Sequence, residues 1–304
     1  MTRRLAIDLG VRELKIVLGD GRRVTRHAEA PLPEGAMQDG VPTQLLTTAL
    51  RAATEGWGGT TMLARVAIAD AGVAVRDFPL PRMPERELAT AVGYEGRRLV
   101  PIDANELYYA WHAQRVEAGY AVYLVAARRD MIDAVHRAVS AAGLQVERID
   151  LKPLALARGM GASDGLVLEW GGSEATLVLM VGGRPRFFRT FLLDAPAEEV
   201  DAQLDELAFS LNALVRFMRT VAPDTTIGPT TPLYVAGRFA FVDDGPGRMQ
   251  RRLDFSVRLP VLSHVTCAPT FPWQAHLAGI GLLKQLSWRA RLIPTQGGDV
   301  RVAA

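Results

Sequence analysis

The chain repeats one pattern at two distant places. Residues 5–24 read LAIDLGVRELKIVLGDGRRV, and residues 166–185 read LVLEWGGSEATLVLMVGGRP. Aligned, the two stretches match acid to acid and glycine to glycine: Asp8 with Glu169, Gly10 with Gly171, Glu13 with Glu174, and Gly21 with Gly182. In each, two aliphatic runs flank a glycine turn, which predicts a β-hairpin. Because the hairpin occurs twice at roughly domain spacing, the sequence predicts a duplicated α/β domain with a cleft between the copies.

Length and composition fit a folded protein of about two domains. The 304 residues are 49% hydrophobic, and 35 Lys and Arg nearly balance 33 Asp and Glu. A nucleic-acid surface would gather its arginines in a basic stripe. Here the arginines are scattered among acids, and only Lys15, Lys152 and Lys284 are lysines. Nucleic acid is therefore set aside as a partner.

The cysteine and histidine content and the hydropathy of the chain indicate its cellular compartment and whether it binds a metal. The single Cys267 rules out an internal disulfide and suits a reducing compartment. The five histidines have no metal-ligand spacing with one another or with Cys267, so we expect no metal site. No apolar run approaches the ~18 residues of a membrane span, and Asp8 interrupts the first apolar stretch too early for a signal peptide. We expect a cytoplasmic protein.

Between the two hairpins, helix and strand signals indicate an insertion into the first domain. Residues 65–81 predict two strands around a glycine turn, 83–101 a helix, 107–128 two more strands, and 129–142 a second helix. The predicted division of the chain follows: a first domain at 1–64 and 143–162, an inserted subdomain at 65–142, a second domain at 163–288, and a flexible tail at 289–304.

Each hairpin places an acid before a glycine turn, an arrangement that suits nucleotide clefts. A carboxylate at a strand end holds hydrated Mg²⁺, and glycine lets backbone N–H groups approach phosphate oxygens. Two such turns facing each other, with a third at Gly237, would hold a phosphate chain. Acid–glycine turns also simply end strands, so the residues alone leave both readings open.

Blocks of unusual sequence follow one another between residues 4 and 192: LAIDLG with LK at 14–15, PLPEGAMQDG (31–40), FPLPRMPERELATAVGYEGRRLVPIDANE (78–106), YLVAARRDMIDAVHRAVSAAGLQVERIDLKPLALAR (123–158) and GGRPRFFRTF (182–191). In this order they resemble the PilM family. PilM is the actin-like cytoplasmic component of type IV pilus assembly and is related to the division protein FtsA. The resemblance implies an α/β, actin-like (RNase H-like, duplicated) two-domain fold with an FtsA-type inserted subdomain.

The resemblance also implies sites and a partner. PilM proteins lie on the inner face of the membrane and capture the N-terminal peptide of PilN, a single-span membrane protein, in a groove between the first domain and the inserted subdomain. The candidate groove residues are Tyr94, Glu95, Arg98 and Pro101, for which ordinary helix surface is an equally good explanation. The candidate nucleotide-cleft residues are Asp8, Gly10, Lys15, Glu169, Gly171, Gly172 and Gly237.

The chain departs from the family pattern at the glycine turns and after the second hairpin. Where the family carries small hydroxylated residues, this chain has Val11, Arg12 and Glu13. A bulky Trp170 follows Glu169, and only a short stretch (192–200) stands where the family has a helical subdomain over the nucleotide base. A connection that short holds no folded lid. We therefore expect ATP with Mg²⁺ to bind weakly or not at all.

These observations predict a non-enzymatic scaffold of a type IV pilus or related secretion system, peripheral to the inner membrane through its partner, with a degenerate nucleotide cleft. The alternative is an ATP-binding actin-like protein, either an ATPase or a membrane-associated filament former like FtsA; oligomeric state stays open, with self-association among the partners. A further hypothesis concerns ARLIP at 290–294, which is similar to the INLLP of PilN-type N-termini, so the tail would mimic the partner peptide.

Overall fold

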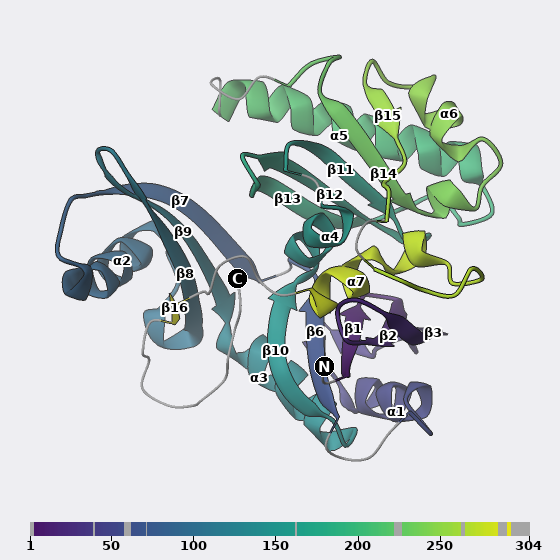
Figure 1. The fold of residues 1–304 in the computed structure, drawn as a ribbon, viewed down its shortest axis with the longest axis horizontal. Helices are drawn as coiled ribbons and strands as arrows, with labels where there is room; N and C mark the ends of the chain where they lie inside the picture. Colours follow the sequence, from purple (N-terminus) through teal and green to yellow (C-terminus); the bar gives the residue numbers. More distant parts are fainter. Residues whose placement is uncertain are drawn as a thin grey trace.

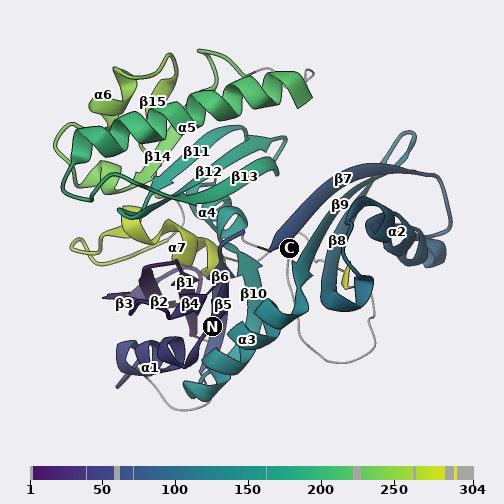
Figure 2. The same cartoon turned by 180° about the vertical axis from the view of Figure 1, so that it is seen from behind.

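The described residues form two five-stranded sheets, a four-stranded sheet and a small two-stranded sheet (Figures 1 and 2). The computed structural model describes residues 3–38, 40–57, 62–70, 72–161, 163–221, 227–262, 265–284 and 291–292. Within these residues no helix is long and apolar enough to cross a membrane.

The two five-stranded sheets have the same topology. In spatial order the first contains β3 (Val24–Pro31), β2 (Glu13–Gly19), β1 (Arg4–Leu9), β6 (Leu63–Ile68) and β10 (Gln145–Leu151). The second contains β13 (Arg184–Leu192), β12 (Glu174–Val181), β11 (Gly165–Trp170), β14 (Pro232–Gly237) and β15 (Ser256–Arg258). In both, three consecutive antiparallel strands are followed by two strands added in parallel. The predicted duplication is confirmed.

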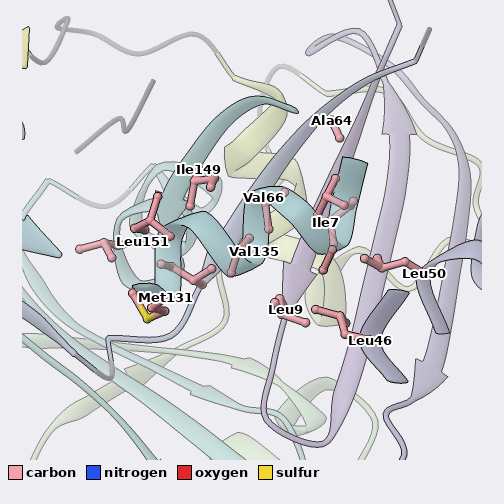
Figure 3. Packing of buried hydrophobic residues seen from close by; sticks show 14 of the residues in the cluster. Ile7, Leu9, Leu46, Leu50, Ala64, Val66, Met131, Val135, Ile149 and Leu151 are labelled. Carbon is pink, nitrogen blue, oxygen red and sulfur yellow. The ribbon is translucent and has the colours of Figure 1, made fainter. Parts of the chain in front are cut away.

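We call the part of the protein built on the first sheet the first half and the part built on the second sheet the second half. Side chains alternate between the two faces of each central strand, and this alternation decides which residues face the junction of the two halves. On β1, Leu5, Ile7 and Leu9 enter the core beneath α1 (Gln44–Ala53) and α3 (Arg129–Ala141) (Figure 3). On β11, Leu166, Leu168 and Trp170 enter the core beneath α5 (Val200–Val221). Because successive side chains of a strand point to opposite faces, Asp8 and Glu169 point to the junction instead.

Two short helices fill that junction, α4 (Lys152–Met160) and α7 (Leu277–Leu283). Small residues let their backbones meet: a Cβ atom at Gly281 would lie 1.7 Å from the carbonyl oxygen of Ala155. Helix α7 also packs on β1 and β6. The predicted second domain, 163–288, therefore included a helix that packs on the first half, because sequence order does not determine which sheet a closing helix covers.

The insertion consists of β7 (Val73–Pro81), α2 (Glu85–Leu99), β8 (Leu107–Val116) and β9 (Gly119–Arg128). It is narrower than the predicted 65–142. The strand β6 pairs with β1, and α3 packs in the core of the first half. The pattern of 65–81 correctly predicted two strands, but hydrogen bonding places β6 and β7 in different sheets.

The remaining elements are short. They are β4 (Met37–Gln38), β5 (Val41–Pro42), α6 (Gly245–Gln250), three single-turn helices at Ala104–Glu106, Arg238–Ala240 and Trp273–His276, and β16 (Arg291–Leu292). Of the predicted flexible tail 289–304, the described part is β16, which pairs with β8.

The close approach of α4 and α7 generates a stability prediction. We expect Gly281→Ala to lower the free energy of unfolding by about 2 kcal/mol. Alanine gains about 1 kcal/mol of helix propensity over glycine, but a side chain pressed against a backbone oxygen costs about 3 kcal/mol. Urea unfolding measures the difference. The matched control is Gly228→Ala, where a Cβ atom meets nothing within 4 Å; equal unfolding midpoints for the two variants would contradict the prediction.

Candidate functional site

A buried lysine lies where the two halves meet. Lys152 is the first residue of α4 and is 1% exposed. Its Nζ lies 2.9 Å from Glu174 Oε1 on β12, 3.2 Å from Glu169 Oε2 on β11 and 3.6 Å from Asp8 Oδ2 on β1. One ammonium group therefore joins both sheets through three carboxylates.

A second lysine, Lys15 on β2, borders the same cluster. Its Nζ lies 2.8 Å from Glu13 Oε1. The two ammonium groups thus face four carboxylates, those of Asp8, Glu13, Glu169 and Glu174. Both Asp8 carboxylate oxygens lack a hydrogen-bond partner among the described residues. A buried acid without hydrogen bonds favours its protonated form.

The pKa values follow from burial and from these neighbours. Burial, with the nearby Glu169, raises the pKa of Asp8 to about 7 against the pull of Lys152. Burial also raises the pKa of Glu13. For Lys152, burial alone would lower the pKa, but Asp8, Glu169 and Glu174 hold it well above its ordinary value. For Glu174, burial alone would raise the pKa, but Lys152, the backbone N–H of Val11 and Lys15 together lower it. The lysines stay charged, and Asp8 titrates near neutral pH.

Each of the two glycine turns is followed by a glutamate whose side chain reaches across the junction to the other turn. Glu174, from the second half, accepts a hydrogen bond at Oε2 from the backbone N–H of Val11 at 2.7 Å. A Cβ atom at Gly10 would lie 2.8 Å from Glu174 Oε1, and one at Gly171 would lie 2.8 Å from Glu13 Oε1. These glutamates are the pair that the internal repeat aligns. Each reaches the glycine turn of the opposite half.

The third turn is covered by an arginine. Gly237, with φ +71°, lies against the Trp170 carbonyl, where a Cβ atom would be 2.3 Å from the oxygen. The next residue, Arg238, folds back so that its guanidinium lies 4.6 Å from the centre of the Trp170 ring. It also donates to Gln203 Oε1 at 3.1 Å, and its Cδ lies 3.3 Å from a Cβ placed at Gly172.

The structure brings most of the predicted cleft residues together. Asp8, Gly10, Lys15, Glu169 and Gly171 surround Lys152, and Gly172 and Gly237 lie beside them under Arg238. Among the described residues, no group of three His, Cys, Asp or Glu is arranged to hold a metal ion. The strand β13 ends at Leu192 and α5 begins at Val200, so no folded subdomain stands between them.

Sequence reasoning did not assign Lys152 to the site, nor Glu13 and Glu174 as its acids. Two signals were available. Lys152 is one of three lysines and lies in the apolar run LKPLALA, and the two glutamates align in the repeat. A charged residue in a buried apolar segment requires a partner.

The predicted groove residues lie apart from this cluster, on α2. Tyr94 is 66% exposed, and Arg98 pairs with Glu95 one turn earlier at 2.7 Å. Helix α2 packs through Leu88 and Val92 on the sheet face that carries Tyr109 and Trp111; the opposite face carries Tyr108, which bonds Asp133 of α3. These residues therefore lie on the side of the four-stranded sheet away from α3, and their role stays a prediction.

The titration of Asp8 generates a pH prediction. Between its ordinary pKa of 3.8 and about 7 the folded protein keeps a proton that the unfolded chain releases. Stability therefore falls as pH rises through this window. In Asp8→Asn this contribution is absent. The stability of the variant relative to wild type should rise by on the order of 4 kcal/mol from pH 4 to pH 8.

Urea unfolding at a series of pH values measures this difference. The control is Asp20→Asn, because hydrogen bonds from the Arg22 and Arg23 backbone N–H groups lower the pKa of the exposed Asp20. Relative to wild type, Asp20→Asn should therefore gain no stability as the pH rises from 4 to 8. A difference between Asp8→Asn and wild type that is flat from pH 4 to pH 8 would show that Asp8 does not carry the proton.

The chain was compared with known proteins. The profile of the family described as "Type IV pilus assembly protein PilM" matches residues 6–180. No curated protein matches the chain. Among solved structures, a PilM–PilN type IV pilus biogenesis complex superposes with a TM-score of 0.73 at 21% identity, covering 92% of this chain and 97% of that one.

Two further structures share the fold. The ethanolamine utilization protein EutJ from Carboxydothermus hydrogenoformans has a TM-score of 0.55 at 15% identity, covering 93% of this chain and 89% of that one. The cytoplasmic domain of EpsL, an inner membrane component of the type II secretion system of Vibrio cholerae, has a TM-score of 0.53 at 13% identity, with 94% and 97% covered.

At these identities the superpositions establish the fold alone, and it is the actin-like two-domain fold that the sequence predicted. The FtsA type of the insertion stays a prediction. The family profile covers more than half of the chain, so together with the two matching sheets it supports one conclusion: this protein belongs to the PilM family of type IV pilus assembly proteins.

Proposed function

We propose that this protein is a non-enzymatic scaffold of a type IV pilus, or related secretion, assembly complex at the inner membrane. Its partner is a PilN-like single-span protein, whose N-terminal peptide it captures beside an FtsA-type insertion. Membership of the PilM family supports the assembly role. The similar structure that contains both PilM and PilN supports the choice of partner. The protein is then cytoplasmic and reaches the membrane through that partner.

The proposal that the protein is not an enzyme is supported above all by the positions of Glu13 and Glu174, because each of these side chains reaches the glycine turn of the opposite half. In a nucleotide cleft, backbone N–H groups at such turns bind phosphate oxygens. Here the carboxylate of Glu174 already accepts the Val11 N–H and fills the space beside Gly10. A phosphate chain would have to displace two carboxylates, and its negative charge would meet a cluster in which acids outnumber lysines.

The residues present therefore do not fit MgATP. Lys152 is already paired with three acids, and the space that Gly172 leaves is next to the Arg238 side chain. The short connection between β13 and α5 contains no folded subdomain that could cover a nucleotide base. We propose that ion pairs within the chain hold the two halves together without a nucleotide.

The alternative function, an ATPase or an FtsA-like filament former, requires a nucleotide between the two turns. It also requires a carboxylate free to activate water. Asp8 is the nearest acid to that role, because both its oxygens lack hydrogen bonds among the described residues. The pairing of Lys152 with three acids, and the positions of Glu13 and Glu174 at the opposite glycine turns, argue against this alternative function.

Calorimetric titration tests the proposed function. A synthetic peptide of the cytoplasmic N-terminus of the PilN-like partner is titrated into the protein with and without MgATP. We expect saturable peptide binding that MgATP does not change, and no saturable binding of MgATP alone at micromolar concentration. Saturable MgATP binding without peptide binding would favour the nucleotide-driven alternative.

Substitutions on α2 test the predicted groove. If Tyr94 and Arg98 contact the peptide, Tyr94→Ala with Arg98→Ala should weaken its binding at least about tenfold, which corresponds to 1.4 kcal/mol. The matched control is Arg86→Ala in the first turn of the same helix, where the side chain is 83% exposed. Equal affinity of both variants and wild type would place the peptide elsewhere.

A further inference from the structure

An apolar groove lies on the second half, between β13 and α5. Its walls include Phe187, Arg189 and Phe191 on the strand and Phe209 and Phe217 on the helix, and it holds about 540 Å³. The centres of the Phe187 and Phe217 rings lie 6.0 Å apart. Pockets that enclose a ligand hold ~300–1,000 Å³. A large side chain from outside therefore fits in the groove.

The internal repeat shows how this groove arises. Strand pairing places Arg189 and Phe191 where the first half has Ala28 and Ala30. In the first half the two small side chains let α1 pack on β3. On β13 the longer side chains occupy that space and keep α5 from closing on the strand. The second half therefore has a groove at a place where the first half is packed.

The groove leaves aromatic surface in contact with water. Phe209 and Phe217 lie about two turns apart on α5, and each is more than half exposed. Leu192, at the end of β13, lines the same groove and is also exposed. Contiguous apolar surface on a folded protein marks an interaction site.

Arg189 gives the groove its charge. It is exposed, and it makes no hydrogen bond or ion pair with another described residue. Asp70 attracts it only from a distance, because the Asp70 carboxylate accepts the backbone N–H of Thr190 at 2.8 Å. Aromatic side chains and arginine are enriched at the buried centres of protein interfaces. The groove therefore suits an aromatic side chain that has a carboxylate beside it.

The chain carries such a pair on the far side of the same half. Phe241, which leads into α6, is more than half exposed, and Asp243 follows it on the surface. Asp243 has no ion-pair or hydrogen-bond partner within the described part of the chain, whereas Asp244 pairs with Arg251. The strands β13 and β15 form opposite edges of the sheet, and α6 packs beside β15 (Figures 1 and 2). The pair and the groove therefore cannot meet within one molecule.

We propose that copies of this protein associate head to tail, with Phe241 of one copy in the groove of the next and Asp243 paired with Arg189. The contact buries apolar surface that each copy otherwise exposes, and it joins two exposed opposite charges. Because the two surfaces differ, each added copy leaves a free groove at one end and a free Phe241 at the other. Copies therefore form an open chain, or a ring if the rotation closes. The association is separate from the proposed function, since it needs neither nucleotide nor partner peptide.

Sedimentation velocity of the full chain, over a series of micromolar concentrations, measures this association. Wild type should sediment faster as its concentration rises. Arg189→Asp brings two acids together at the contact, and Asp243→Arg brings two arginines together, so each variant alone should associate at least about tenfold more weakly. An equal mixture of the two variants should regain the sedimentation of wild type, because every contact between unlike copies again pairs an acid with an arginine.

Matched variants separate the contact from general effects of charge and folding. Glu34→Arg makes the same change of charge at an exposed acid of the first half and should sediment like wild type. Phe241→Ala should weaken association without a change of charge. Urea unfolding of every variant, with a midpoint close to that of wild type, shows that the variant is folded.

Three results would overturn the inference. The first is a wild type that remains monomeric at every concentration. The second is a mixture of Arg189→Asp and Asp243→Arg that sediments like the separate variants. The third is association that Arg189→Asp weakens and Asp243→Arg does not, which would show that the groove receives another surface, such as the groove of a second copy.

Discussion

The contact between Lys152 and its three carboxylates is the constraint on which the arrangement of the two halves depends. A buried ammonium group is costly unless it is paired and hydrogen-bonded. Here Asp8 belongs to the first sheet, and Glu169 and Glu174 belong to the second. The pairing is therefore satisfied only when β1, β11, β12 and the start of α4 are all in place. Removing the lysine alone would leave three buried acids without their shared counter-ion.

The same cluster connects the fold to the proposed function. In a cleft built to bind nucleotide, the glycine turns keep their N–H groups for a ligand. In this chain Glu174 takes the Val11 N–H and Glu13 approaches Gly171, so each half supplies an anion to the other. Under the proposed function, the protein needs no nucleotide to hold its halves together. Its predicted binding surface is then on the insertion, at α2.

Much of the fold was predictable from local patterns. The repeated hairpins predicted two equivalent sheets, because an apolar run that ends in a glycine turn has few alternatives. Alternation along β1 and β11 also fixed which side of the strand Asp8 and Glu169 occupy. The boundaries of the insertion were less predictable. Residues 63–68 and 73–81 both have strand patterns, and only pairing with β1 or with β9 assigns them to different sheets.

The sequence by itself determined the duplication, the strands and helices, the family, and the acids and glycines at the turns. Those features depend on side-chain period and on local backbone preference, which neighbouring residues carry. Only the tertiary structure decided that Lys152 pairs with Asp8, Glu169 and Glu174, that α7 packs on the first half, and that residues 291–292 lie on β8. These contacts join residues far apart in the chain, and their energies depend on burial and charge that arise only when the two halves meet.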